Sequence, residues 1–218
     1  MQRQNNFYFF LFISIIIFIS SCSNNNLFLP KNGDLLFQDL DSSPLCDGIE
    51  KVTQGINGWD FSHIGIVTII NNQHYVLEAF SNGVDTVMLD TFLNRSMNID
   101  KKQKVVVGRL KSQYSYLIEK AIYIGMAMIG EQYDSEFKID NNKFYCSELI
   151  YDMFLKANNN KPIFKLNPMT YKFNGETLEV WEHYFENLNI PIPENEPGIN
   201  PGGISLSEKI TIVHDYTL

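Results

Sequence analysis

The feature that most restricts the fold is a pair of strand-like segments separated by only two residues. Residues 62–70 and 73–80 are both largely apolar, with β-branched or aromatic side chains that favour extended backbone. Asn71 and Asn72 lie between them, and asparagine suits the tight turn of a two-residue hairpin. The pattern therefore predicts an antiparallel β-hairpin at the centre of the chain.

A two-residue turn also fixes which side chains face one another. In that register Glu78 lies opposite Gly65, on the same face as His63 and one diagonal step away, a separation of roughly 7 to 8 Å that long side chains bridge. A slip of one residue would turn Glu78 to the other face. His74 shares the face but lies roughly 13 Å further along, so we expect it at the surface.

Cys146 stands where a polar loop changes into a segment with helical periodicity. The apolar residues that follow it fall on one side of a helix, at Leu149, Ile150, Met153, Phe154 and Ala157. A thiol at the start of that helix faces unpaired backbone N–H groups and the positive end of the helix dipole, which favour a nucleophilic thiolate. Glu148 suits the first helical turn and is interpreted as structural. A small buried hydrophobe remains the alternative for Cys146.

The remaining pattern mixes strands and helices, which predicts an α+β domain. Further strands are expected at residues 33–38, 84–89, 104–110 and 209–214, and helices at 45–55, at 114–129 and from Cys146 onward. Residues 90–102 read as a polar crossing with room for a short helix. An aromatic-rich segment at 169–187 and a strap of four prolines and three glycines at 190–203 are expected to form the walls of a cleft.

Composition excludes several classes of function. The formal net charge of -8, the pI near 5.0 and the lack of a Lys/Arg cluster argue against a nucleic-acid partner. No spacing typical of a metal site and no phosphate-binding glycine loop occurs, so no metal and no cofactor is predicted. With 44% hydrophobic and 19% charged residues, the chain has the composition of one globular domain.

The N-terminus is predicted to be a processing segment, residues 1–21, whose apolar run is too short to cross a bilayer comfortably. Residues 19–22, Ile-Ser-Ser-Cys, resemble the lipobox of bacterial lipoproteins, in which the signal is cut before an acylated cysteine. Cys22 would then start a lipidated tether, residues 22–32, that anchors the domain at 33–218 to a membrane of the cell envelope. A plain secretory signal with an incidental cysteine is the alternative.

Five short motifs in a fixed order carry a resemblance to a known family. They are Gly33-Asp34-Leu35, Ser62-His63-Ile64-Gly65, Leu77-Glu78-Ala79, Gly130-x-x-Tyr133-Asp134 and Tyr145-Cys146-Ser147-Glu148-Leu149. Together they resemble the circularly permuted papain-like cysteine hydrolases of the YiiX/YaeF type, within the NlpC-related superfamily of cell-wall amidases. The proline-rich tail is similar too. The resemblance implies an NlpC-type papain-like fold, in which an antiparallel sheet packs against the nucleophile helix.

The resemblance also implies a role for individual residues. Cys146 would be the nucleophile, His63 the general base and acid, Glu78 the third polar residue, and Tyr133 part of the oxyanion hole beside the backbone N–H of the nucleophile. Contacts to the substrate are expected from three aromatic residues, Tyr145, Trp181 and Tyr184. In an exported protein Cys46 and Cys146 could form a disulfide, but the proposed chemistry requires both to be free. Asp34 and Asp134 are interpreted as turn or capping residues, and Cys46 has no assigned role.

The expected function is therefore a lipid-anchored thiol amidase or peptidase. Its substrate would be a peptidoglycan stem peptide or an N-acylated amino acid, and its membrane contact would be through Cys22. A second possibility is acyl transfer or lipid ester hydrolysis, because the lecithin:retinol acyltransferase group shares the permuted layout, although that group tends to have a histidine where this chain has Glu78. A third is a non-catalytic envelope binding module on the same scaffold.

Overall fold

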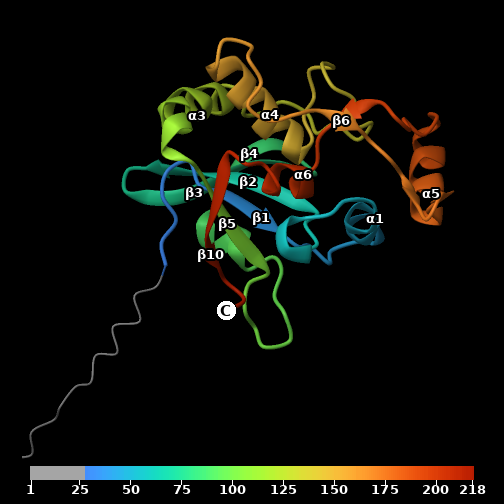
Figure 1. Cartoon of the computed structure of the whole chain (residues 1–218), viewed down its shortest axis with the longest axis horizontal. Coiled ribbons are helices and arrows are strands. Elements are labelled where there is room, and N and C mark those ends of the chain that lie inside the picture. The colour runs from blue at the N-terminus through green and yellow to red at the C-terminus, as the bar shows by residue number, and fades with distance from the viewer. Residues whose placement is uncertain (1–27) are drawn as a thin grey trace, which may run out of the picture.

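The computed structural model describes residues 28–218, so the predicted signal segment and Cys22 lie outside the described residues. A six-stranded antiparallel sheet, in the order β10-β5-β1-β2-β3-β4, forms its centre (Figure 1). The strands are β1 (Leu35–Gln38), β2 (His63–Ile70), β3 (Gln73–Phe80), β4 (Gly83–Met88), β5 (Val105–Leu110) and β10 (Ile210–Asp215). This arrangement confirms the predicted antiparallel sheet.

The central hairpin has the predicted register. Ile70 pairs with Gln73 and Ile66 pairs with Leu77 across β2 and β3. Asn71 and Asn72 both have positive φ, 51° and 61°, as a two-residue hairpin turn of the right twist requires. The local turn chemistry therefore sets the pairing of the two strands that supply His63 and Glu78.

Six α-helices accompany the sheet in the described residues 28–218. They are α1 (Pro44–Val52), α2 (Leu89–Leu93), α3 (Ile118–Met126), α4 (Cys146–Ala157), α5 (Glu179–Leu188) and α6 (Pro201–Ser205). The helix expected at 114–129 is too long, because 3₁₀ turns over Ser112–Leu117 precede α3. The strap at 190–203 is also less irregular than expected, since β9 (Pro197–Gly198) pairs with β6 (Asn167–Pro168) and α6 begins inside it. A further small ladder joins β7 (Lys172–Phe173) to β8 (Glu176–Thr177).

The main core lies between the sheet and the pair α3 and α4. The apolar stripe of α4 is fully buried against β2 and β3, which confirms the helical periodicity read after Cys146. A Cβ atom at Gly125 of α3 would lie 2.6 Å from the Met153 side chain and 2.7 Å from that of Leu77. Glycine at this position therefore lets α3 approach α4 closely. A second, smaller core on the other sheet face packs beneath α2.

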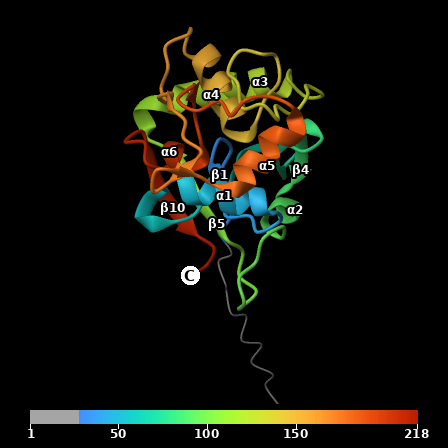
Figure 2. The same ribbon diagram turned by 90° about the vertical axis from the view of Figure 1, so that its right-hand side faces the viewer.

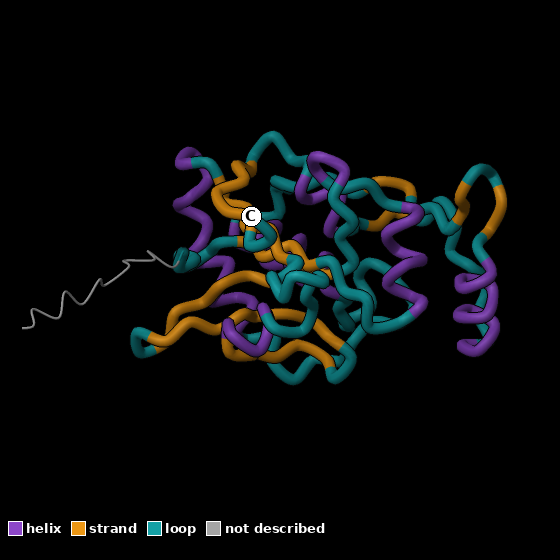
Figure 3. Tube along the Cα trace, turned by 90° about the horizontal axis from the view of Figure 1, so that it is seen from below, coloured by secondary structure: helices purple, strands orange, loops and turns teal. Residues whose placement is uncertain are grey.

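Helices α1 and α5 lie side by side at one end of the molecule (Figure 2). The indole N–H of Trp181 on α5 donates a hydrogen bond to the carbonyl of Gly48 on α1, at 3.3 Å. The described chain starts at the opposite end from α5, as Figures 1 and 3 both show. In the described part of the chain, no helix is both long enough and apolar enough to cross a membrane.

Candidate active site

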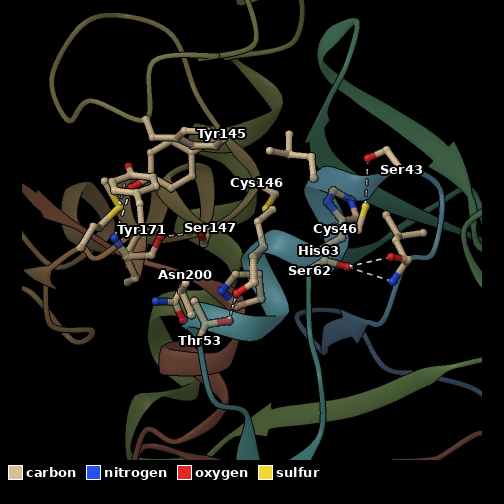
Figure 4. Close-up of a pocket in the computed structure, with 18 of the residues that line it drawn as sticks. Ser43, Cys46, Thr53, Ser62, His63, Tyr145, Cys146, Ser147, Tyr171 and Asn200 are labelled. Carbon is tan, nitrogen blue, oxygen red and sulfur yellow. Dashed lines mark hydrogen bonds between the residues drawn. The ribbon is translucent and has the colours of Figure 1, made fainter. Parts of the chain in front are cut away.

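Cys146 is the first residue of α4 and lines a cavity of about 360 Å³ (Figure 4). Tyr145 precedes it in extended conformation, so the chain turns into the helix at the cysteine, as predicted. The Cys146 residue is only 7% exposed. Because Cys146 is the first residue of the helix, its backbone N–H has no partner inside the helix and lies at the positive end of the helix dipole. The location fits a nucleophile beneath a cavity.

His63, the first residue of β2, also lines this cavity and is held by Glu78 of β3. Its Nε2 atom lies 2.6 Å from Oε2 of Glu78, and both side chains are buried. Aromatic rings of Phe80 and Phe92 pack against the imidazole, with centroids 5.2 and 5.7 Å away. Because Nε2 is committed to the carboxylate, Nδ1 is the nitrogen that remains for the thiol.

The surroundings of His63 and Glu78 stabilise the charged form of each side chain. Burial alone would lower the pKa of His63, but Cys146 and Glu78 outweigh it and raise the pKa to about 9. Burial would raise the pKa of Glu78, yet His63 and Arg95 together hold it below its ordinary value. The electrostatics therefore favour a protonated His63 imidazolium paired with an ionised Glu78 carboxylate at neutral pH.

Arg95 completes this chain of charges and is the residue that sequence reasoning missed. Its guanidinium donates to both oxygens of Glu78, at 2.7 Å from Nη1 and 2.5 Å from Nη2, and lies over the ring of Phe80. It follows α2 in a segment with no motif or periodicity. The sequence does contain one clue to Arg95, because only three of the 17 basic residues are arginine. A planar two-point contact with a carboxylate needs arginine and not lysine. Arg109 makes the same kind of contact with buried Asp34.

These two arginines give a matched test. We expect Arg95→Lys and Arg109→Lys to lower the free energy of unfolding by a similar amount, roughly 1.5–3 kcal/mol, since each loses one charge-assisted hydrogen bond. Only Arg95→Lys should also reduce kcat/KM, by roughly tenfold if about 1.4 kcal/mol of transition-state stabilisation is lost. Urea denaturation and steady-state kinetics measure both quantities. Equal kinetic losses in the two variants would mean that Arg95 acts only through stability.

Tyr133 is brought beside Cys146 by a short parallel bridge to Phe144. The Asp134 amide donates to the Phe144 carbonyl at 3.2 Å, and the Phe144 amide donates to the Gln132 carbonyl at 3.0 Å. Burial first, and then the neighbouring charge of Cys146, raise the pKa of Tyr133 well above its ordinary value. The phenol therefore keeps its proton and is able to donate a hydrogen bond into the cavity that it lines.

The two acidic residues interpreted as turn or capping groups do accept backbone hydrogen bonds. Asp134 accepts from the amides of Glu136 and Lys138, at 2.9 and 2.7 Å, and so shapes the loop that follows Tyr133. Asp34 accepts from the amide of Lys31 at 2.7 Å, in addition to its pair with an arginine. Both predictions are confirmed.

The aromatic residues predicted to contact substrate have different surroundings. Tyr145 and Trp181 line the cavity and are buried, so they form its walls. Tyr184 does not line the cavity. Its hydroxyl donates to the carbonyl of Ser135 at 2.9 Å, which places it as a support of the loop after Tyr133. Trp181 and Tyr184 both pack near Phe137, and the substrate contact of Tyr184 stays a prediction.

The residues on either side of the nucleophile hold the C-terminal strap. The Ile199 amide donates to the hydroxyl of Tyr145 at 3.2 Å, and the hydroxyl of Ser147 donates to the Ile199 carbonyl at 2.9 Å. Asn200 and Pro201, the next residues, line the cavity. The segment expected to form the cavity wall is thus fixed directly to the start of α4.

Cys46, which had no predicted role, lines the same cavity from α1. Its sulfur lies 3.5 Å from the hydroxyl oxygens of both Ser42 and Ser43 (Figure 4). Cys46 and Cys146 are both free thiols, as expected. Their shared location could not be read from the sequence, because they lie one hundred residues apart on different helices.

Apart from His63, the cavity wall has no side chain that is charged at neutral pH by its ordinary chemistry. Among the described residues that line it there is no Asp, Glu, Lys or Arg. Aliphatic and aromatic side chains form most of the surface, and its polar groups are hydroxyls, thiols, one amide and the His63 imidazole. A cavity of this size and character suits an uncharged and largely apolar group.

Comparisons with known proteins show the family and the fold of this chain. A family model described as a permuted papain-like amidase enzyme, YaeF/YiiX, C92 family, matches residues 30–214. The uncharacterized protein YiiX of Escherichia coli strain K12 is 30% identical over 129 residues, which span 59% of this chain and 59% of that protein. A crystal structure described as metalloprotein yiiX from Escherichia coli O157:H7 matches with a TM-score of 0.69 and 23% identity, over 85% of this chain and 97% of the other.

Proposed function

Because this chain belongs to the YaeF/YiiX family of permuted papain-like amidases, the C92 family, we propose that it is a cysteine hydrolase that cleaves an amide bond with Cys146, His63 and Glu78. The family and the permuted papain-like fold confirm the resemblance drawn from the five motifs. The single observation that carries the proposed chemistry is the 2.6 Å contact between His63 and buried Glu78, on the wall of the cavity that Cys146 lines.

The proposed reaction has two steps. The Cys146 thiolate attacks the amide carbonyl and forms the carbon–sulfur bond of a tetrahedral intermediate, whose collapse then breaks the carbon–nitrogen bond. The imidazolium of His63 gives its proton to the leaving amine, so that a free amine departs and a thioester remains. Neutral His63 then takes a proton from water, which attacks the thioester, releases a carboxylic acid and regenerates the thiolate.

The oxyanion of each tetrahedral intermediate would be held by two donors, the backbone N–H of Cys146 and the hydroxyl of Tyr133. The raised pKa of Tyr133 supports this role, because a donor has to keep its proton near a thiolate. One donor of this kind is typically worth about 2.7–4 kcal/mol in the transition state. Glu78, held by Arg95, orients the imidazole and stabilises its positive form.

The largely apolar cavity favours an N-acylated amino acid over a peptidoglycan stem peptide. A stem peptide has several charged groups, and apart from His63 the described cavity wall offers no charged side chain to pair with them. An aliphatic acyl group needs no such partner. We therefore propose that the acyl side of an N-acyl amino acid occupies the cavity, with its amide carbon at Cys146.

The proposed location is the cell envelope, with the chain anchored through lipidated Cys22. The support is the order of signal, lipobox and polar tether in the sequence.

The solved neighbour is described as a metalloprotein. The described residues of this chain contain no group of three or more His, Cys, Asp or Glu side chains that could hold a metal ion, so no step is assigned to one.

Product analysis by mass spectrometry tests the proposed substrate. The full chain is incubated separately with N-acyl amino acids of varied chain length, with muropeptides and with phospholipids. Release of fatty acid and amino acid from the first group alone is the expected result. Cleavage of muropeptides alone would place the substrate among stem peptides. Products from phospholipids alone would favour the ester hydrolysis or acyl transfer that the permuted layout also allows.

The raised pKa of His63 predicts a specific pH profile. The proposed acid form of His63 exists below about pH 9 and is lost as the pH rises through that value, so kcat/KM should fall on the alkaline side with an apparent pKa near 9. Glu78→Gln removes a group that raises this pKa and should move the alkaline limb to lower pH. An unchanged limb in Glu78→Gln would show that another group controls it.

A further inference from the structure

Phe28, the first residue that the structure describes, packs against the end of β10. The ring of Phe28 stacks on His214 with a centroid distance of 4.0 Å and packs edge-on against Tyr216 at 6.0 Å. Cys22 precedes Phe28 by six residues, and six residues span at most about 20 Å. If Cys22 is anchored in a membrane, the surface around Phe28 therefore has to lie close to that membrane.

A rigid loop with an apolar tip projects beside this exit point. Ile99 is 97% exposed at the tip of the segment between α2 and β5, and Met97 of the same loop is also exposed. The loop is stiff, because the side-chain oxygen of Asn98 accepts hydrogen bonds from the amides of Asp100 and Lys102, and a bridge joins Met97 to Gln103. A loop built this firmly around an exposed isoleucine holds that side chain out in the solvent.

Contacts within the structure place this loop next to the chain exit. The Lys102 ammonium donates to the carbonyls of Thr217 and Leu218, at 3.0 and 2.9 Å, and these residues follow the Tyr216 that packs on Phe28. Leu218 is exposed as well. The loop tip, the C-terminus and the first described residue therefore share one region of the surface, visible at the lower part of Figure 1.

Leu29, the residue after Phe28, is an exposed apolar residue. Leu29 and exposed Met88 of β4 line a shallow groove together with the Asn71–Asn72 turn of the central hairpin. We call the set Leu29, Met88, Met97, Ile99 and Leu218 the docking face. Asp100, Lys101 and Lys102 in the same loop have charges of both signs. The exposed apolar side chains, and not a net charge, therefore distinguish this face.

We propose that the docking face rests on the surface of a phospholipid bilayer, with Ile99 inserted among the lipids. The inference depends on the proposed anchor at Cys22, which keeps the face within reach of the bilayer and so makes a weak contact sufficient, as linked binding sites do. It goes beyond the anchor, because it fixes the orientation of the domain. The α1 and α5 end, where Trp181 and Cys46 line the cavity, then points away from the membrane (Figures 1 and 3).

Site-specific photocrosslinking in the full chain tests this orientation. A benzophenone amino acid replaces Ile99 in one variant and Leu188, an exposed isomeric residue at the end of α5, in the matched control. Both chains are produced in bacteria that process lipoproteins, and isolated membranes are irradiated. We expect at least about tenfold more phospholipid adduct at position 99 than at position 188, by mass spectrometry.

The outcomes separate the docking face from the anchor. Membrane-bound chain with equal lipid adducts at the two positions, or with adducts at 99 only to protein or to a second copy, overturns the docking proposal and leaves the anchor in place. Chain that stays out of the membrane fraction overturns the anchor and the docking proposal with it. Neither outcome bears on hydrolysis at Cys146.

Discussion

Replacing Cys146 with alanine is expected to lower kcat/KM by about 10⁴-fold or more, equivalent to at least roughly 5.5 kcal/mol of transition-state stabilisation. The loss is large because the side chain forms the covalent intermediate, and no neighbouring group in the same position replaces it. The fold should survive, since alanine fills nearly the same space at the first position of α4. Hydrolysis rates, with circular dichroism to check folding, measure the result.

Cys46→Ala provides the matched control, because it removes the other thiol of the same cavity. Its sulfur contacts the hydroxyls of Ser42 and Ser43, so it should lose at least a hundredfold less activity than Cys146→Ala. Iodoacetamide should accordingly modify Cys146 much faster than Cys46 in the folded protein at neutral pH. Full hydrolytic activity in Cys146→Ala, or preferential labelling of Cys46, would contradict the assignment of Cys146 as the nucleophile.

His63→Gln should reduce kcat/KM by a similar factor, about 10⁴-fold, because a single member of a triad accounts for most of its effect. Glutamine keeps a hydrogen-bonding side chain next to Glu78 but neither accepts nor donates the transferred proton. Alkylation of Cys146 should slow as well, since the imidazolium that supports the thiolate is gone. Steady-state kinetics and labelling rates at pH 7 give the two measurements.

The control for this variant is His74→Gln on the same hairpin. His74 pairs with Ile69 near the turn and does not line the cavity, so its replacement should leave kcat/KM within about twofold. If the two histidine variants behaved alike, the loss would have to come from damage to the hairpin. If His63→Gln kept its rate, the proton carrier would have to be another group on the cavity wall.

Local chemistry explains which parts of the site were predictable. The Asn71–Asn72 turn allows one register, and that register places Glu78 next to His63 without further information. The periodicity after Cys146 places the thiol at the start of α4 for the same reason. Both predictions depend on residues close together in the chain, where turn geometry and helical repeat leave few alternatives.

The parts that escaped prediction depend on tertiary packing. Arg95 reaches Glu78 because α2 folds back across the sheet, and nothing in the sequence near Arg95 marks that path. Cys46 enters the cavity only because α1 packs on α5. The hydrogen bond from the Tyr184 hydroxyl to the Ser135 carbonyl likewise depends on how α5 packs against that loop.

The clamp on Ile199 has a consequence for the synthesis of the protein. Tyr145 and Ser147 grip both sides of a peptide group more than fifty residues downstream, and Asn200 and Pro201 close the cavity beside it. A nascent chain that has emerged only as far as α4 already contains the sulfur, the imidazole and the carboxylate but has no finished pocket to receive a substrate. Nearly the whole polypeptide must therefore leave the ribosome before this cavity has its complete wall, so binding to the cavity has to wait until synthesis is almost finished.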